Sequence, residues 1–153
     1  CSSDLGLQGV MLAEHGYKNI DCVDANEAML ELAKKKGVFN KVFAAKLGWG
    51  NKLDIPDNTY DACITCGTFV EGHLRADCFE ELIRVTKPGV IIMGDIFLTK
   101  DTNEIESPYL RETFPVITSQ HEADGLWKLE WSKDCDGLMA NTRFFVYRIT
   151  KNH

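Results

Sequence analysis

The chain has 153 residues, of which 44% are hydrophobic and 26% are charged, and its formal net charge is −6. These values are typical of one globular domain, and the acidic balance argues against a nucleic-acid partner, whose phosphates need clustered Lys and Arg. No apolar run is long enough to span a bilayer and no secretory h-region is present, so we expect no membrane association.

Helices and strands are expected to alternate in the first part of the chain. Leu7, Val10 and Met11 are spaced to share one face of a first helix. Residues 20–23 form a short apolar run that is typical of a strand buried on both faces. Asn26 is placed to cap a second helix, because its side chain can accept bonds from the first free backbone N–H groups.

The alternation continues through the middle of the chain. Strands are predicted over residues 42–47, 60–66 and 90–96, and an amphipathic helix containing Phe79, Leu82 and Ile83 precedes the last of them. Ser107 followed by Pro108 predicts an N-cap and the first residue of a further helix.

The last part of the chain changes to a strand pattern. Trp127 and Trp131 alternate with polar residues, so we expect both rings to pack on a face of the sheet. The alternative is that they form part of a lid over the substrate. Asp136-Gly137 predicts a turn, and residues 142–149 alternate again, which indicates a closing antiparallel hairpin. The whole pattern predicts a single α/β domain over residues 1–153 with an open sheet.

The six cysteines favour a reduced protein over a disulfide framework, because a chain of this length can bury a core without disulfides. Cys63 and Cys66 are three residues apart in an expected strand, so their side chains point to opposite faces and cannot share a metal ion. We therefore predict a cytoplasmic protein without a metal site.

Several motifs together give this chain a family resemblance. It resembles the class I S-adenosylmethionine-dependent methyltransferases, most closely the Williams–Beuren-region methyltransferase-like group, from Gly6 to about Ile149. The motifs are Gly6-Leu-Gln-Gly9, Val23-Asp24 followed by Met29-Leu30, Tyr60-Asp61-Ala62, and Arg84-Val-Thr-Lys-Pro-Gly89 before an apolar strand. The resemblance implies a Rossmann-like sheet of order 3-2-1-4-5-7-6, with strand 7 antiparallel, and S-adenosylmethionine as cofactor.

The start of the chain departs from this family. No strand precedes Gly6, so we expect an N-terminally incomplete copy that lacks strand 1, with a gap or distorted junction between the strands on either side of it. Ser2 and Asp4 stand where the family has glycines. Residues 1–5 are either non-native, since they match a possible translation of a common sequencing adapter, or the native motif is degenerate. Both interpretations stay open.

The resemblance also implies where the cofactor and the acceptor bind. Asp24 would hold the ribose hydroxyls through charge-assisted hydrogen bonds. The other predicted cofactor residues are Gly6, where backbone approaches the cofactor, Ala25 and Leu47 beside the adenine, and Cys66 and Gly67 near the methyl group.

The loop after residues 60–66 is the predicted acceptor side, because ligands of open α/β sheets bind beyond the carboxyl ends of the strands. Glu71 and His73 are the candidate catalytic residues, His73 as a base, and Phe69 and His73 are the candidate substrate-binding residues. The alternative that Glu71 and His73 only decorate a solvated loop stays open.

The predicted function is methyl transfer from S-adenosylmethionine to a small molecule or a protein side chain by the full-length protein, with these 153 residues alone inactive. One alternative is a non-catalytic protein that keeps the methyltransferase fold as a binding partner. Another is a nicotinamide-dependent oxidoreductase, against which the chain's size and its closing hairpin argue. The oligomeric state is left open.

Overall fold

The structure is a computed structural model that describes residues 6–99, 101–136 and 141–151, without the side chains of Val90, Ile91 and Met93. The chain divides into two compact units, Cys1–Leu47 and Gly48–His153, and each is described by itself. The predictions for residues 1–5 and for a turn at Gly137 lie outside the described residues. Within the described part of the chain, no helix is both long and apolar enough to cross a membrane.

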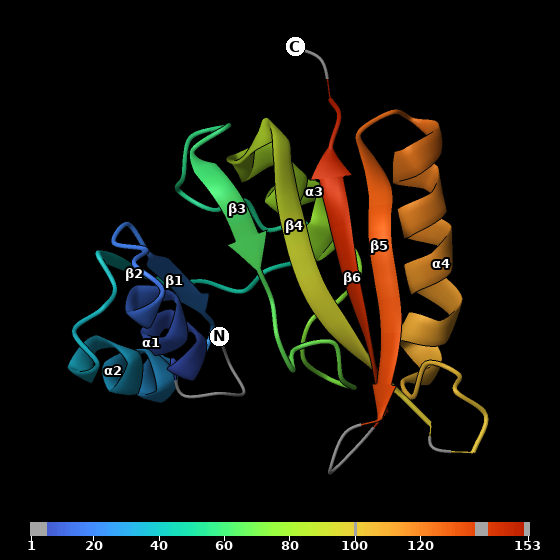
Figure 1. Cartoon of the computed structure of the whole chain (residues 1–153), viewed down its shortest axis with the longest axis horizontal. Helices are drawn as coiled ribbons and strands as arrows, with labels where there is room; N and C mark the ends of the chain where they lie inside the picture. The colour runs from blue at the N-terminus through green and yellow to red at the C-terminus, as the bar shows by residue number, and fades with distance from the viewer. Residues whose placement is uncertain (1–5, 100, 137–140, 152–153) are drawn as a thin grey trace. The chain divides into compact units, whose positions relative to one another are not determined.

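The first unit combines two helices with a small parallel sheet (Figure 1). Its elements in chain order are α1 (Leu7–Glu14), β1 (Asp21–Asp24), α2 (Glu27–Lys35) and β2 (Lys41–Ala44). β1 and β2 run parallel, with Asp21 opposite Lys41 and Asp24 opposite Ala44. Cys22, Leu30 and Ala33 form the buried centre, against which Phe39 and Val42 pack.

The predicted cap of α2 is confirmed. The Asn26 side-chain oxygen accepts hydrogen bonds from the backbone N–H groups of Ala28 at 3.0 Å and Met29 at 3.3 Å. These bonds satisfy two donors that have no partner inside the helix. The cap also fixes where β1 ends and α2 begins, and Asp24 lies at that junction.

The first helix does not pack through its apolar face, and the prediction for the first strand is wrong. Leu7 and Met11 are 53% and 59% exposed, whereas Gly6 and Gly9 are the buried residues at this helix. A Cβ at Gly9 would lie 2.2 Å from the Phe39 ring, so the helix packs through its glycines because only they leave room for that ring. β1 is buried on alternate residues rather than on both faces.

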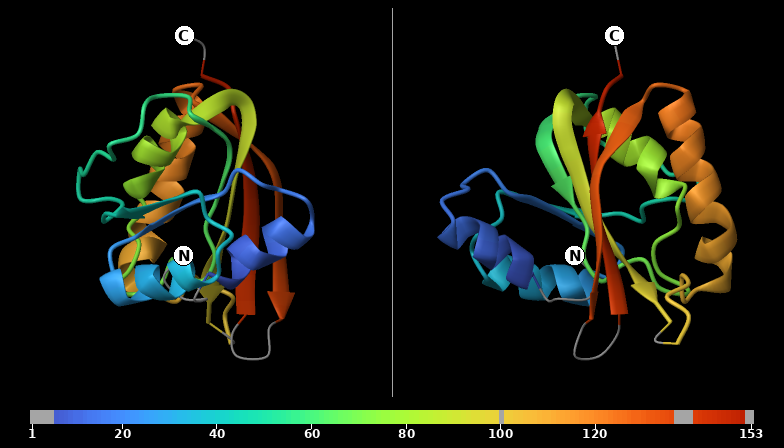
Figure 2. Two further views of the ribbon diagram at one scale, coloured as in Figure 1. Left: turned by 90° about the vertical axis from the view of Figure 1, so that its left-hand side faces the viewer. Right: turned by 45° about the vertical axis from the view of Figure 1, so that its right-hand side comes forward.

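The second unit is a four-stranded sheet with two helices on one face (Figure 2). Its elements are β3 (Tyr60–Ile64), α3 (Cys78–Val85), β4 (Thr86–Leu98), α4 (Pro108–Ala123), β5 (Trp127–Asp136) and β6 (Asn141–Ile149). The strand order is β3-β4-β6-β5, with β3 and β4 parallel and β6 antiparallel to both of its neighbours. Ser107 caps α4 as predicted, accepting from Leu110 N–H at 3.3 Å.

The observed strand orders agree with the predicted fold class. β2-β1 corresponds to strands 3 and 2 of the expected sheet, and β3-β4-β6-β5 corresponds to strands 4, 5, 7 and 6. The antiparallel β6 takes the place of strand 7. Among the described residues, β1 pairs only with β2, and β3 pairs only with β4.

Aromatic rings fill the core between the sheet and its two helices. The members, from five different segments, are Phe69, Phe79, Phe114, Trp127, Phe145 and Tyr147, and neighbouring ring centroids lie 4.0–6.0 Å apart. Trp127 is 1% exposed and stacks on Tyr147, as the alternating pattern predicted. The same prediction is wrong for Trp131, which is half exposed, because the pairing of β5 with β6 shifts between Leu129 and Trp131.

Gly94 of β4 is expected to be a sensitive position in this core. A Cβ there would lie 2.4 Å from Thr65 Oγ1 and 2.5 Å from the Phe145 ring, which is itself held by other rings. Gly94→Ala should therefore lower the free energy of unfolding by about 1–3 kcal/mol. Val116→Ala, on the exposed face of α4, is the control and should stay within about 0.5 kcal/mol of wild type in urea unfolding. Equal effects of the two substitutions would contradict the packing.

Candidate active site

Asp24 is a buried carboxylate with one unsatisfied oxygen. It ends β1 and is 6% exposed. Its Oδ1 accepts a hydrogen bond from Asn26 N–H at 2.8 Å, whereas its Oδ2 has no hydrogen-bond partner among the described residues. A buried carboxylate oxygen without a donor is costly, so this atom is a candidate for binding a hydroxyl-bearing ligand. The ribose contact of Asp24 stays a prediction.

The other predicted cofactor residues of the first unit differ in exposure. Ala25 is exposed beyond the end of β1, and Leu47 is half-buried. Gly6 is buried and precedes α1 with a φ of +79°, and a Cβ there would lie 3.2 Å from the Phe39 ring. Both the positive φ and the nearby Phe39 ring therefore explain why a glycine occupies position 6. Its predicted approach to the cofactor stays a prediction.

In the second unit, the loop after β3 is bonded to β4 through Asp95. The Gly67 N–H donates to Asp95 Oδ1 at 2.7 Å, and the Cys66 thiol lies 3.8 Å from Asp95 Oδ2. Asp95 is 5% exposed, and burial raises the pKa of its carboxyl, while the bonds from Gly67 and Cys66 act in the opposite direction. The structure thus brings together Cys66 and Gly67, both predicted site residues, around a third group that was not predicted.

Asp95 could have been found in the sequence. It is the one charged residue in an otherwise apolar run, residues 90–96, that was predicted as a buried strand. A buried ionisable group rarely occurs without a specific partner. Two neighbouring hydroxyls, those of Thr65 and Thr68, are also buried without a hydrogen-bond partner among the described residues. Nothing in the local sequence pattern distinguishes them.

Glu71 and His73 are both exposed, but their side chains do not form a pair. The His73 Nδ1 lies 3.1 Å from the Glu71 backbone oxygen, not from the carboxylate. The Glu71 carboxylate instead accepts from the Ser107 hydroxyl at 2.5 Å, at the start of α4. The observed contact of Glu71 is therefore structural, and His73 presents an exposed imidazole in the same loop.

Phe69 lies in the aromatic core rather than at the surface. Its ring is 1% exposed and packs against Phe79, Phe114 and Phe145. A contact between Phe69 and a methyl acceptor stays a prediction that this burial does not support. The sequence could not distinguish the two roles, because a phenylalanine after a strand can point either into the core or into a cleft.

Cys63 and Cys66 have different partners. Cys63 Sγ lies 3.1 Å from Thr86 Oγ1, and burial raises the pKa of its thiol to about 11. Cys66 instead contacts Asp95. The predicted divergence of the two sulfurs agrees with these partners. In the described part of the chain, no group of three or more His, Cys, Asp or Glu side chains is arranged to hold a metal ion.

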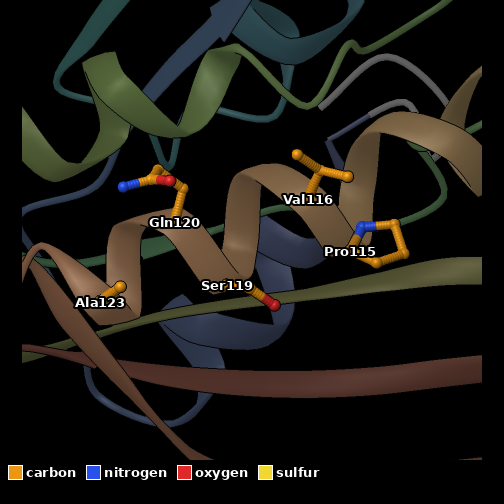
Figure 3. Close-up of a pocket in the computed structure, with 5 residues that line it drawn as sticks. All are labelled: Pro115, Val116, Ser119, Gln120 and Ala123. Atoms are coloured by element: carbon orange, nitrogen blue, oxygen red, sulfur yellow. The ribbon is translucent and has the colours of Figure 1, made fainter.

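An open pocket lies on the outer face of α4 (Figure 3), lined by Pro115, Val116, Ser119, Gln120 and Ala123. All five residues come from one helix, and none carries an ionisable side chain. This pocket offers no ionisable side chain for acid–base chemistry, so the candidate site remains at the strand ends.

Residues 4–93 match the methyltransferase domain family, and this segment is more than half of the chain. The chain belongs to that family. S-adenosylmethionine stays the predicted cofactor, and Asp24, whose Oδ2 has no hydrogen-bond partner among the described residues, stays a candidate for binding it. The resemblance that the sequence motifs indicated is confirmed.

A curated human protein agrees with the family assignment. Methyltransferase-like protein 27 of Homo sapiens is 30% identical over 131 residues, which cover 84% of this chain and 51% of the human protein. The chain therefore spans about half the length of this curated relative.

Solved structures show the same fold. A SAM-dependent methyltransferase of Leishmania major superposes with a TM-score of 0.72 at 14% identity, covering 97% of this chain and 62% of that one. A SAM-dependent methyltransferase of Aquifex aeolicus gives 0.58 at 21% identity, with coverages of 94% and 79%.

Asp95→Ala is expected to lower the free energy of unfolding by about 1–3 kcal/mol, because the Gly67 N–H loses its acceptor. Asp95→Asn keeps an acceptor oxygen and should cost less. Urea unfolding of the full-length protein at neutral pH makes the comparison. An Asn variant that is less stable than the Ala variant would contradict the role given to this hydrogen bond.

The buried Asp95 carboxyl also predicts that stability depends on pH. Because burial raises the pKa of Asp95 in the folded state, its protonated form favours folding, and this contribution is lost as pH rises through the folded-state pKa. Wild-type stability should therefore fall relative to Asp95→Asn between about pH 4, near the ordinary carboxyl pKa, and pH 7. A relative gain by the wild type over this range would show that hydrogen bonds outweigh burial.

Proposed function

We propose that the domain transfers a methyl group from S-adenosylmethionine to a small molecule or a protein side chain. The observation that carries the proposal is the buried Asp24 carboxylate, which ends its strand with one oxygen unsatisfied among the described residues. In a methyltransferase domain, this position suits recognition of ribose hydroxyls. The family assignment favours this function over a nicotinamide-dependent oxidoreductase.

The cofactor supplies a methyl group on a positively charged sulfur. The residues of the chain bind and orient it, because positioning is a large part of what an enzyme contributes to an in-line transfer. Asp24 would accept hydrogen bonds from the ribose hydroxyls, with its other oxygen held by Asn26 N–H. Ala25 and Leu47 would provide apolar neighbours for the adenine, and Gly6 would allow close approach of the backbone.

On the acceptor side, the loop after β3 carries the groups that would contact the reacting atoms. Gly67 is held by Asp95, which restricts where the Cys66-Gly67 backbone lies. His73 is exposed and can accept a proton from an acceptor as it is methylated. Glu71 would act by holding the loop against α4 through Ser107, so it is a positioning residue in this proposal.

Asp24→Asn is expected to weaken binding of S-adenosylhomocysteine by about tenfold to a hundredfold, because hydrogen bonds to a charged group contribute about 1.5–3 kcal/mol. Calorimetry on the full-length protein measures the affinity. Asp21→Asn is the matched control, since Asp21 lies on the same strand and its Oδ1 also accepts from a backbone N–H, that of Lys41 at 3.0 Å. Equal affinities for wild type and Asp24→Asn would remove Asp24 from the site.

His73→Ala is expected to lower methyl transfer at least about tenfold while leaving S-adenosylhomocysteine affinity nearly unchanged, because a general base acts on the acceptor. The measurement is incorporation of labelled methyl from S-adenosylmethionine into a cell extract that contains small molecules and proteins. His15→Ala is the control, because His15 is also exposed and its Nδ1 also contacts a backbone oxygen, that of Met11 at 2.8 Å. Unchanged transfer in the His73 variant would leave this residue a solvated loop position.

A further inference from the structure

Arg75 differs from the other arginines of the chain in what its guanidinium contacts. The other four each donate hydrogen bonds to protein oxygens: Arg84 to Glu81, Asp57 and Leu53, Arg111 to Ile105, Arg143 to Asp134, and Arg148 to Glu130 and Gly89. Arg75 has an ion pair with Asp77 at 3.5 Å but no hydrogen bond to any described residue. Its Nε is buried against Asp77, so the two terminal NH₂ groups are the donors left for a ligand.

Aromatic rings hold this guanidinium in place. Its central carbon lies 4.7 Å from the centroid of the Tyr109 ring and 5.3 Å from that of Trp49. Contact with aromatic faces removes water from the guanidinium plane and leaves the in-plane N–H edge for hydrogen bonding. The Arg75 side chain is 38% exposed, so a solute can reach this edge.

Asp77 contacts both Trp49 and Arg75. Its Oδ2 accepts from Trp49 N–H at 2.8 Å, and its Oδ1 faces Arg75 Nε. Trp49 has a φ of +57°, which a bulky residue adopts only when its surroundings hold it there. A Cβ at Gly48 would lie 2.7 Å from Asp77 Oδ1, so the turn is built tightly onto this carboxylate. The cluster is thus ordered before any ligand binds.

The cluster lies where the second unit would bind an acceptor. The loop containing His73 and Arg75 leaves the carboxyl end of β3, and the segment that leads into α4 leaves the carboxyl end of β4. Because these two strands are parallel, both segments emerge at one edge of the sheet. They meet through the Glu71–Ser107 hydrogen bond and the contact of Arg75 with Tyr109.

We propose that Arg75, with its guanidinium against Trp49 and Tyr109, binds a carboxylate group of the methyl acceptor. The inference rests on the proposed methyl transfer, because it places Arg75 on the acceptor side of that reaction. A planar carboxylate matches the guanidinium edge, which can donate two parallel hydrogen bonds. The neighbouring carboxylate of Asp77 limits the local positive charge, so a singly charged carboxylate fits better than a doubly charged phosphate.

The test measures binding of two carboxylates, benzoate and acetate, and of the matched neutral amides, benzamide and acetamide. Saturation-transfer NMR on the full-length protein gives the affinities with and without S-adenosylhomocysteine. We expect a carboxylate to bind wild type, and we expect Arg75→Met to weaken this binding about tenfold or more. The affinity of Arg75→Lys should lie between those of wild type and Arg75→Met, because Lys keeps the charge but not the paired donors.

Arg143→Met is the matched control. Its side chain is 40% exposed, a fraction similar to that of Arg75. Its guanidinium, however, already donates to Asp134 at 2.6 and 2.8 Å. This variant should bind the carboxylates as wild type does. Thermal unfolding and S-adenosylhomocysteine affinity should match wild type in Arg75→Met, which separates loss of the acceptor contact from loss of the fold.

The proposal is overturned if neither carboxylate binds wild type, if Arg75→Met binds them unchanged, or if the amides bind equally well. These outcomes are independent of the cofactor. Failure of wild type to bind S-adenosylhomocysteine would contradict the proposed methyl transfer, whereas Arg75-dependent carboxylate binding without that cofactor would still support the anion site.

Discussion

The parallel pairing of β3 with β4 is the constraint on which the chemistry of the second unit depends. It brings the carboxyl ends of both strands to one edge, so two loops that are far apart in sequence meet there. The Gly67–Asp95 hydrogen bond ties the first loop to β4, and the Glu71–Ser107 bond ties it to the start of α4. The exposed His73 and the partly exposed Arg75 follow these two bonded residues in the same loop.

Both candidate sites contain polar atoms without a hydrogen-bond partner among the described residues. Other arginines are engaged by protein carboxylates, as in the bidentate Arg143–Asp134 and Arg148–Glu130 contacts. Asp24 Oδ2 and the Arg75 guanidinium lack hydrogen bonds to described residues despite well-defined surroundings. Asp24 Oδ2 is a hydrogen-bond acceptor, which suits the ribose hydroxyls of the proposed cofactor. The Arg75 guanidinium is a donor, which suits the carboxylate of the proposed methyl acceptor.

The features that could be predicted from the sequence are those decided locally. Asn26 and Ser107 cap helices because each side chain reaches N–H groups two or three residues away. The strand order followed from the family resemblance. The features that were missed depend on distant contacts: Phe39 buries the glycine face of α1, and a register shift leaves Trp131 exposed. Arg75 acquires its role only when separate segments meet, so the sequence pattern did not predict that role, whereas Asp95 could have been noticed as the one charge in an apolar run.

The central claim is that Asp24 marks the cofactor site of a methyltransferase domain. The most direct measurement is a crystal structure of the full-length protein with S-adenosylhomocysteine. The account predicts that Asp24 Oδ2 lies within hydrogen-bonding distance, about 2.5–3.0 Å, of a ribose hydroxyl, while Oδ1 keeps its bond to Asn26 N–H. A ribose bound elsewhere, with Asp24 Oδ2 in contact only with protein or water, would contradict it.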